Sequence, residues 1–179
     1  MGTFPARLLP TPLPSMPRLA LRVAATLAVL TLLPAAGPAS AEGIRHLRIG
    51  PALYADAREA LVDAIEAEGL VPSPPSQFGD MLARTAPALG ETTPVYQQAE
   101  VMHFCSALIA WQLARENPVN IAQCHLSMAI YTRPGQSAAV HLAWREAHGD
   151  SQGARAANAL LERIARQVAD NAGRAAMSR

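Results

Sequence analysis

The chain has 179 residues, and its 15 basic residues, all arginine, nearly balance its 14 acidic ones. Because there is also no basic run, nucleic-acid binding has little electrostatic support, and we expect no nucleic-acid partner. Beyond a leader segment, the length fits one domain that can bury a single core.

Residues 1–41 have the pattern of a secretory signal peptide. Arginines without any acid occupy the first part, an apolar run covers residues 23–33, and Ala39-Ser40-Ala41 supplies the small residues of a cleavage site. The apolar run is shorter than the roughly 20 residues that span a bilayer, so we expect cleavage rather than anchoring. Met16 is an alternative start, because residues 1–15 add only a proline-rich prefix.

We therefore expect cleavage after Ala41 and a periplasmic or secreted protein. Residues 42–179 then form a single α/β domain with no stable membrane span. Export matters for the two cysteines, because cysteines in an oxidising compartment usually pair where geometry allows.

The mature chain opens with a strand and a helix. Residues 44–49 alternate apolar and polar side chains, which predicts a half-buried strand with Ile44, His46 and Arg48 on one face. A helix is predicted over residues 56–68, with Asp56 as its N-cap and Gly69 as the left-handed residue after its end.

The next segment predicts weaker structure. Prolines make residues 71–76 an extended surface loop. Residues 78–86 are predicted to form a short helix, closed by Pro87 and Gly90, with three side chains facing inward: Phe78, Met81 and Leu82.

Two strands flank the most apolar helix. We expect a strand over residues 95–104, central in the sheet at its end, and then a helix over residues 106–116 that Ser106 can cap. Asn117-Pro118 ends this helix because proline cannot continue it. A third strand is predicted over residues 121–132, with Leu126, Met128 and Ile130 on one face.

A hairpin and a long helix complete the chain. Residues 133–136 have proline and glycine at the central positions of a type II turn, and residues 138–144 alternate again, which predicts an antiparallel hairpin. The last helix runs from Ser151 to about Ala172, with an i, i+4 pair of Glu162 and Arg166. The predicted order is β-α-(α)-β-α-β-β-α.

Candidate chemistry centres on the only two cysteines. Cys105 lies at a strand-to-helix junction, where the positive end of the helix dipole favours a reactive thiolate. Cys124 is predicted near the start of the third strand. The two are candidates for a disulfide or a redox pair, and for that the loop before Cys124 must fold back along the helix. Unpaired buried thiols and a metal site stay as alternatives.

His103, Cys105, Cys124 and His125 are also candidate metal ligands. Their spacing matches no zinc finger, and on a strand Cys124 and His125 would point to opposite faces, so three ligands at most could converge. Cysteine and histidine ligands would suit copper or a haem axial position, and no C-x-x-C-H motif for covalent haem attachment occurs. The remaining histidines are expected on a solvated sheet face, namely His46 and His141, and in a loop, namely His148.

Hydrolysis through Cys105 would need a histidine base and an oxyanion site. His103 is two residues away, but no oxyanion loop, glycine-rich phosphate loop or serine nucleophile elbow is evident. The chain therefore lacks a catalytic constellation, and a non-enzymatic role is favoured.

Three segments resemble the Domain of Unknown Function 302 family: residues 99–107 with their Phe-Cys-Ser-Ala element, residues 117–121 with Cys124, and residues 129–131. Family members typically show Phe-Cys-Ser or Phe-Cys-Asn, a following helix ending in Asp-Pro, and a second cysteine opening a strand. Here Asn117 replaces the aspartate, and His125 and Leu126 stand where the family has Pro-Tyr or Pro-Arg.

The resemblance covers residues 52–172. It implies an α+β two-layer sandwich, with helices packed on one face of a mostly antiparallel sheet, and often a homodimer. It brings no settled activity. The favoured hypothesis is an exported accessory or binding protein of unknown ligand that requires no cofactor. The alternative is a periplasmic thiol-redox protein, or one handling metal or haem, that uses Cys105 and Cys124.

Overall fold

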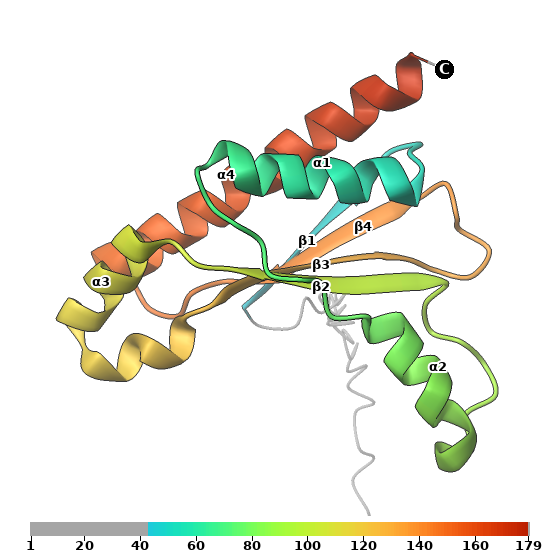
Figure 1. Ribbon diagram of the computed structural model, residues 1–179, viewed down its shortest axis with the longest axis horizontal. Helices are drawn as coiled ribbons and strands as arrows, with labels where there is room; N and C mark the ends of the chain where they lie inside the picture. Colours follow the sequence, from blue (N-terminus) through green and yellow to red (C-terminus); the bar gives the residue numbers. More distant parts are fainter. Residues whose placement is uncertain (1–42, 179) are drawn as a thin grey trace, which may run out of the picture. The chain divides into compact units, whose positions relative to one another are not determined.

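A computed structural model describes residues 43–178 of the chain (Figure 1). The signal-peptide prediction falls outside these residues. The elements follow the predicted order, with one added 3₁₀ helix, η1: β1 (Ile44–Ile49), α1 (Tyr54–Ala67), α2 (Phe78–Leu89), β2 (Gln98–Phe104), α3 (Ala107–Glu116), η1 (Pro118–Gln123), β3 (Leu126–Thr132), β4 (Val140–Arg145) and α4 (Gln152–Met177).

The four strands form one antiparallel sheet in the order β1-β4-β3-β2. The β3–β4 hairpin lies in the middle, and its turn carries Gly135 at φ 74° with a hydrogen bond from Gln136 N to Arg133 O, as a type II turn requires. β1 and β2 are the edges. The prediction that β2 would end at the centre of the sheet is therefore wrong.

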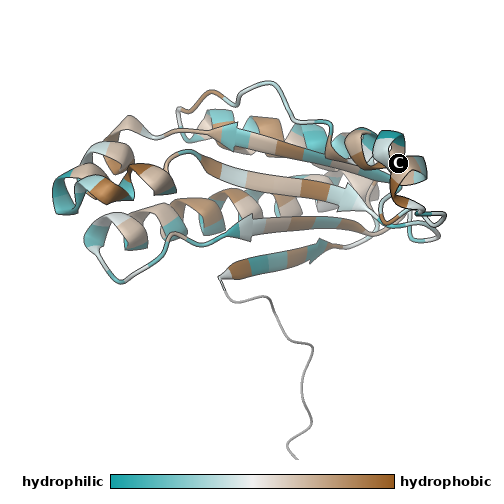
Figure 2. Ribbon diagram, turned by 90° about the horizontal axis from the view of Figure 1, so that it is seen from below, coloured by the Kyte–Doolittle hydropathy of each residue, from teal (hydrophilic) through white to brown (hydrophobic). Residues whose placement is uncertain are grey.

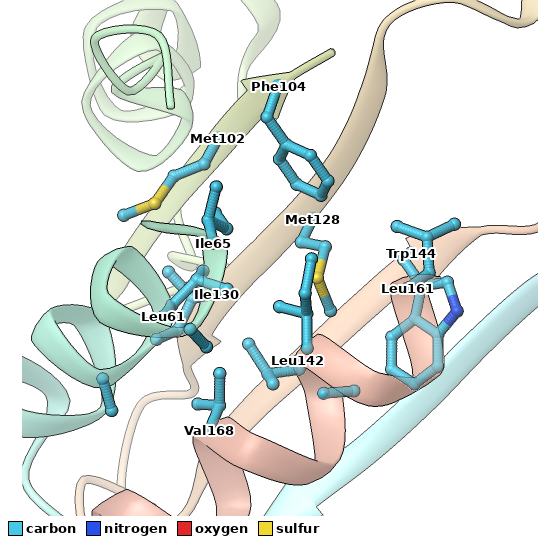
Figure 3. Close-up of a cluster of buried hydrophobic side chains, with 14 of the residues drawn as sticks. Leu61, Ile65, Met102, Phe104, Met128, Ile130, Leu142, Trp144, Leu161 and Val168 are labelled. Atoms are coloured by element: carbon cyan, nitrogen blue, oxygen red, sulfur yellow. The ribbon is translucent and has the colours of Figure 1, made fainter. Parts of the chain in front are cut away.

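One face of the sheet carries the hydrophobic core. The alternation of each strand places its large apolar side chains on this face, and α1 and α4 cover it (Figure 3). The result is the α+β two-layer sandwich that was predicted. The buried side chains that Figure 3 labels come from five elements: Leu61, Ile65, Met102, Phe104, Met128, Ile130, Leu142, Trp144, Leu161 and Val168.

The opposite sheet face carries the alternate residues of each strand, and hydrophilic and hydrophobic segments follow one another along the strands (Figure 2). On β1 this face carries Ile44, His46 and Arg48, as the alternation predicted, and all three are exposed. His141 also lies here, but only 7% of it is exposed, so its predicted place on a solvated face is wrong. The rings of His46 and Tyr131 both stack on it and lie 6.4 Å from each other, and this three-ring cluster limits the access of water to His141.

Helix α2 begins against the β2 edge, on the side of the sheet away from α1 and α4 (Figure 1). Glycine at position 79 permits this approach, because a Cβ there would lie 3.1 Å from the Ala99 backbone nitrogen. No residue of α2 is buried, and 39% of Phe78 is exposed. The inward packing predicted for Phe78, Met81 and Leu82 is only partial, because Met81 and Leu82 are half-buried and Phe78 meets the Tyr96 ring edge-on.

Several predicted boundaries also shift. α1 begins at Tyr54, so Asp56 lies inside its first turn rather than at the N-cap. α2 continues through Pro87 to Leu89, and Gly90 caps its end with φ 72°. The last helix extends to Met177. None of the helices within residues 43–178 is long and apolar enough to cross a membrane.

Candidate functional site

The two cysteines meet at one end of the sheet, with their Sγ atoms 3.4 Å apart. The register of the β2–β3 pair explains why the two cysteines are close. Phe104, the last residue of β2, pairs with Leu126, the first residue of β3. Cys105 directly follows Phe104, and Cys124 lies two residues before Leu126, so both cysteines lie at the same end of the sheet. The chain leaves through α3 and returns through η1 between them (Figure 1).

Hydrogen bonds from side chains of residues 106–120 return the chain toward Cys105. Ser106 caps α3, its Oγ accepting a hydrogen bond from Ile109 N at 3.4 Å, as its sequence position predicted. Asn117 then starts η1 by accepting from Val119 N at 3.2 Å. Asn120 donates from Nδ2 to the Leu113 carbonyl of α3 at 3.0 Å, which holds η1 against the helix.

η1 corrects the sequence prediction of a strand starting at residue 121. Residues 118–123 turn as a 3₁₀ helix, which Cys124 N closes by donating to Ile121 O at 3.2 Å. Gln123 donates to Asn120 Oδ1 at 2.9 Å and accepts from His148 N at 2.7 Å. Cys124 therefore precedes β3 instead of lying on it, and the loop folds back as a disulfide would need.

The two thiols differ in environment. Cys105 is exposed, whereas Cys124 is only partly accessible. Burial, together with the neighbouring Cys105 thiol, raises the pKa of Cys124 to about 11. The separation exceeds the roughly 2.05 Å of a disulfide bond, so the two sulfurs are thiols in contact. The peptide bond between Cys124 and His125 is cis.

The other predicted metal ligands do not join this pair into a site. His103 lies on β2, half-buried, and its carbonyl accepts from Ser73 N at 2.8 Å. His125 is exposed. Across residues 43–178, no group of three or more His, Cys, Asp or Glu side chains is arranged to hold a metal ion. The structure thus brings together Cys105 and Cys124 but not a four-ligand cluster.

Exposed apolar side chains lie on the same two elements that separate the thiols. We call this set the apolar patch, and its four members are 66–79% exposed: Leu108, Trp111, Val119 and Ile121. The sequence prediction placed Leu108 and Trp111 in an apolar helix, but only Ile109 and Leu113 of α3 are buried. The spacing of these residues could have predicted this, because Leu108 and Trp111 share a helix face that differs from the face of Ile109 and Leu113.

A second feature that the sequence did not predict is a hollow beside α2. It has a volume of about 530 Å³ and lies between α2 and residues 91–96. Apolar side chains of Leu82, Leu89 and Val95 line it, together with Tyr96 and the carboxylate-bearing Glu91.

Comparison with known proteins gives one informative likeness. No family model matches the sequence, and no curated protein matches it. Among solved structures, an uncharacterized conserved DUF302 protein from Bacillus stearothermophilus superposes with a TM-score of 0.56 at 13% sequence identity. The match covers 74% of this chain and 99% of that protein. The chain therefore has a DUF302-like fold, which agrees with the resemblance in its sequence.

Proposed function

We propose that this chain is an exported accessory protein whose functional group is the Cys105–Cys124 thiol pair, converting reversibly between two thiols and a disulfide. The supporting observation is the 3.4 Å contact between the Sγ atoms. Bond formation then needs only a small approach of the two sulfurs, to roughly 2.05 Å. The two electrons and two protons released are taken up by an external disulfide, which becomes two thiols.

Two features favour a reversible pair over a purely structural bridge. Cys105 is exposed, so an external disulfide can reach its sulfur. The segment between the cysteines is also held by hydrogen bonds of its own, from Ser106, Asn117 and Asn120. A bridge would therefore add little to a segment that is already fixed.

The deciding measurement is a redox titration of the pair, read by intact mass after alkylation. We expect a midpoint between about −120 and −270 mV, the range of proteins that exchange disulfides, whereas structural bridges lie below about −300 mV. Cys105→Ser should abolish the transition. A midpoint below about −300 mV, together with a stability loss of about 2–4 kcal/mol on reduction, would identify a structural bridge instead.

Export rests on the pattern of residues 1–41, with arginines before an apolar run and Ala39-Ser40-Ala41 after it. An oxidising compartment would also supply the disulfides with which the pair exchanges. Expression of the full chain in a Gram-negative host should yield periplasmic protein whose intact mass is that of a chain beginning at Glu42. Recovery of uncleaved protein in the cytosol would contradict this assignment.

A second candidate function, binding of a small apolar molecule, is supported by the hollow beside α2. Its volume of about 530 Å³ lies within the usual range of ligand sites. The uncharged dye Nile red is a suitable probe. Ala86→Trp, which fills the hollow, should weaken dye binding, whereas Ala159→Trp on the exposed side of α4 should not. Equal dye binding by both variants would exclude the hollow as the binding site.

We also propose that the protein forms a homodimer, as the family resemblance implies. Helix α2, which buries none of its residues in this chain, gives physical support, since a second copy could cover its apolar side chains. Light scattering coupled to gel filtration should report twice the mass of the mature chain. A monomer mass at micromolar concentration would refute this proposal.

A further inference from the structure

The apolar patch is unusual because its side chains are large and largely in water. Leu108 is 79% exposed, Trp111 66%, and Ile121 75%. Single exposed apolar residues need no explanation, but four on two adjacent short elements form a surface that favours contact with another molecule. Tryptophan is also the residue type most enriched at binding hot spots.

The apolar patch is next to the thiols along the chain on both sides. Leu108 lies in the first turn of α3, three residues after Cys105. Ile121 lies one 3₁₀ turn before Cys124, whose backbone nitrogen donates to the Ile121 carbonyl. A molecule seated on the apolar patch is thus brought beside the exposed sulfur of Cys105.

The charge distribution around the thiols indicates what kind of molecule this is. No aspartate, glutamate, lysine or arginine occurs in residues 101–114 or 117–132. Of the two charged residues between these segments, Arg115 lies over the Trp111 ring with its Cζ 5.4 Å from the centroid, and Glu116 accepts a hydrogen bond from Gly153 N at 2.7 Å. A small disulfide with several carboxylates, such as oxidised glutathione, finds little to bind here. Cores of protein–protein interfaces share this depletion of charge and enrichment in aromatic residues.

We propose that the apolar patch docks a polypeptide that carries a disulfide beside apolar residues, and that Cys105 attacks this disulfide. Cys124 then acts as the resolving thiol. The inference rests on the proposed redox function of the pair and adds its partner class and the order of the two thiols.

The exchange balances without any further oxidant. Cys105 gives its proton to water, and its thiolate attacks one partner sulfur. A bond forms between the two sulfurs while the partner's S–S bond breaks, and the released partner thiolate takes up a proton. Cys124 next loses its proton and attacks Cys105 Sγ. The mixed disulfide breaks, the second partner thiolate takes up a proton, and Cys105–Cys124 is left oxidised.

Accessibility supports this order of attack. Cys105 is exposed, whereas Cys124 is partly covered. Burial and the adjacent Cys105 also raise the pKa of Cys124 to about 11, which keeps it protonated until a mixed disulfide removes the Cys105 thiol as its neighbour. A protonated thiol is a poor nucleophile, so the first attack belongs to Cys105.

The test uses the reduced full-length mature protein carrying Cys124→Ser, which should trap the mixed disulfide. Three probes are compared by intact mass: a synthetic peptide with an internal disulfide flanked by leucine and phenylalanine, the same peptide with aspartates in those places, and oxidised glutathione. We expect the apolar peptide to react at least about tenfold faster than the other two, with the adduct on Cys105.

Trp111→Ala in the same background should lower the rate with the apolar peptide about tenfold more than the rate with glutathione. Met177→Ala, which removes another exposed apolar side chain at the far end of α4, is the matched control and should leave all three rates unchanged. Circular dichroism verifies that each variant is folded.

The outcomes separate the two proposals. Equal rates with all three probes, or no selective effect of Trp111→Ala, would overturn docking at the apolar patch and leave the redox pair standing. Preference for glutathione would identify a small-molecule disulfide as the partner and overturn the polypeptide assignment. No adduct with any probe would overturn both proposals.

Discussion

The Nε2 atom of His46 lies 3.0 Å from the Nδ1 atom of His141, and the two imidazole rings stack with centroids 5.1 Å apart. His141 also stacks on Tyr131, with ring centroids 5.0 Å apart. Burial lowers the pKa of His141 below its usual value, and the charges of His46, Arg48 and Arg133 lower it further. Neutral His141 is therefore part of the folded sheet.

This arrangement predicts an acid-sensitive contribution to stability. In the unfolded chain His141 binds a proton near pH 6.5, but in the folded protein it binds one only at lower pH. The stabilisation is fully present above about pH 6.5 and is lost as pH falls through the folded pKa. His141→Asn should flatten the dependence of the unfolding free energy on pH between about 7 and 5.

Urea unfolding at several pH values measures this slope. His148→Asn changes an exposed histidine in a loop and should keep the slope of the natural protein. If His141→Asn and the natural protein lose stability in parallel as pH falls, His141 is not the responsible group.

Two glycines of α4 predict opposite effects of one substitution. A Cβ at position 153 would lie 2.9 Å from Leu113 Cδ2 and 2.8 Å from Glu116 Oε2, whereas nothing lies within 4 Å of a Cβ at position 173. Gly153→Ala should therefore cost on the order of 1–3 kcal/mol through overpacking between α3 and α4. Gly173→Ala should stabilise the helix by about 0.5–1 kcal/mol.

Chemical denaturation of both variants measures the difference directly. Because both variants replace glycine by alanine in α4, the effect of helix propensity cancels in the comparison of their unfolding free energies. The remaining difference reports the packing of position 153 against α3. A Gly153→Ala variant as stable as Gly173→Ala would mean that α3 can move away at no cost.

The thiols should also differ in their reactivity. Raising the pKa of Cys124 to about 11 lowers its thiolate fraction at neutral pH about a hundredfold relative to an unshifted thiol. Limited iodoacetamide at pH 7 should therefore label exposed Cys105 first, and peptide mapping should locate the label. Cys105→Ser removes a neighbour that raises this pKa, so Cys124 should then react faster. Equal labelling of both cysteines in the natural protein would contradict the assigned order.

Local features of the fold could be predicted from the sequence because they depend on neighbouring residues. The alternation of β1 and the cap at Ser106 are set by side chains within a few positions, and the structure confirms them. The order of the strands in the sheet could not be predicted in this way. His46 meets His141 only because β1 pairs with β4, and no local pattern states that pairing.

The candidate site was predictable only in part. Two cysteines in the chain, and a loop that must fold back for them to meet, were visible in the sequence. The means of folding back was not, because Asn120 reaches Leu113 of α3 through a tertiary hydrogen bond. The pattern of α2 likewise identified its apolar side chains but not how deeply they pack, and the described chain leaves none of them fully buried.

The hydrogen bonds of Asn120 predict how the pair's redox midpoint can be changed. Its Nδ2 donates to Leu113 O at 3.0 Å and its Oδ1 accepts from Gln123 at 2.9 Å, so one side chain holds η1 against α3 and Cys124 beside Cys105. Asn120→Ala should loosen η1 and lower the effective concentration of one thiol at the other. Each lost bond contributes about 0.5–1.5 kcal/mol.

This loss disfavours the disulfide relative to the two thiols, so the midpoint should become less negative by on the order of 30 mV, which corresponds to about 1.4 kcal/mol for a two-electron couple. Titration against a dithiothreitol buffer measures the shift. Asn171→Ala removes an asparagine side chain from α4, far along the chain from both thiols, and should leave the midpoint in place. An unchanged midpoint in Asn120→Ala would mean that the thiols are held together by the ends of β2 and β3 alone.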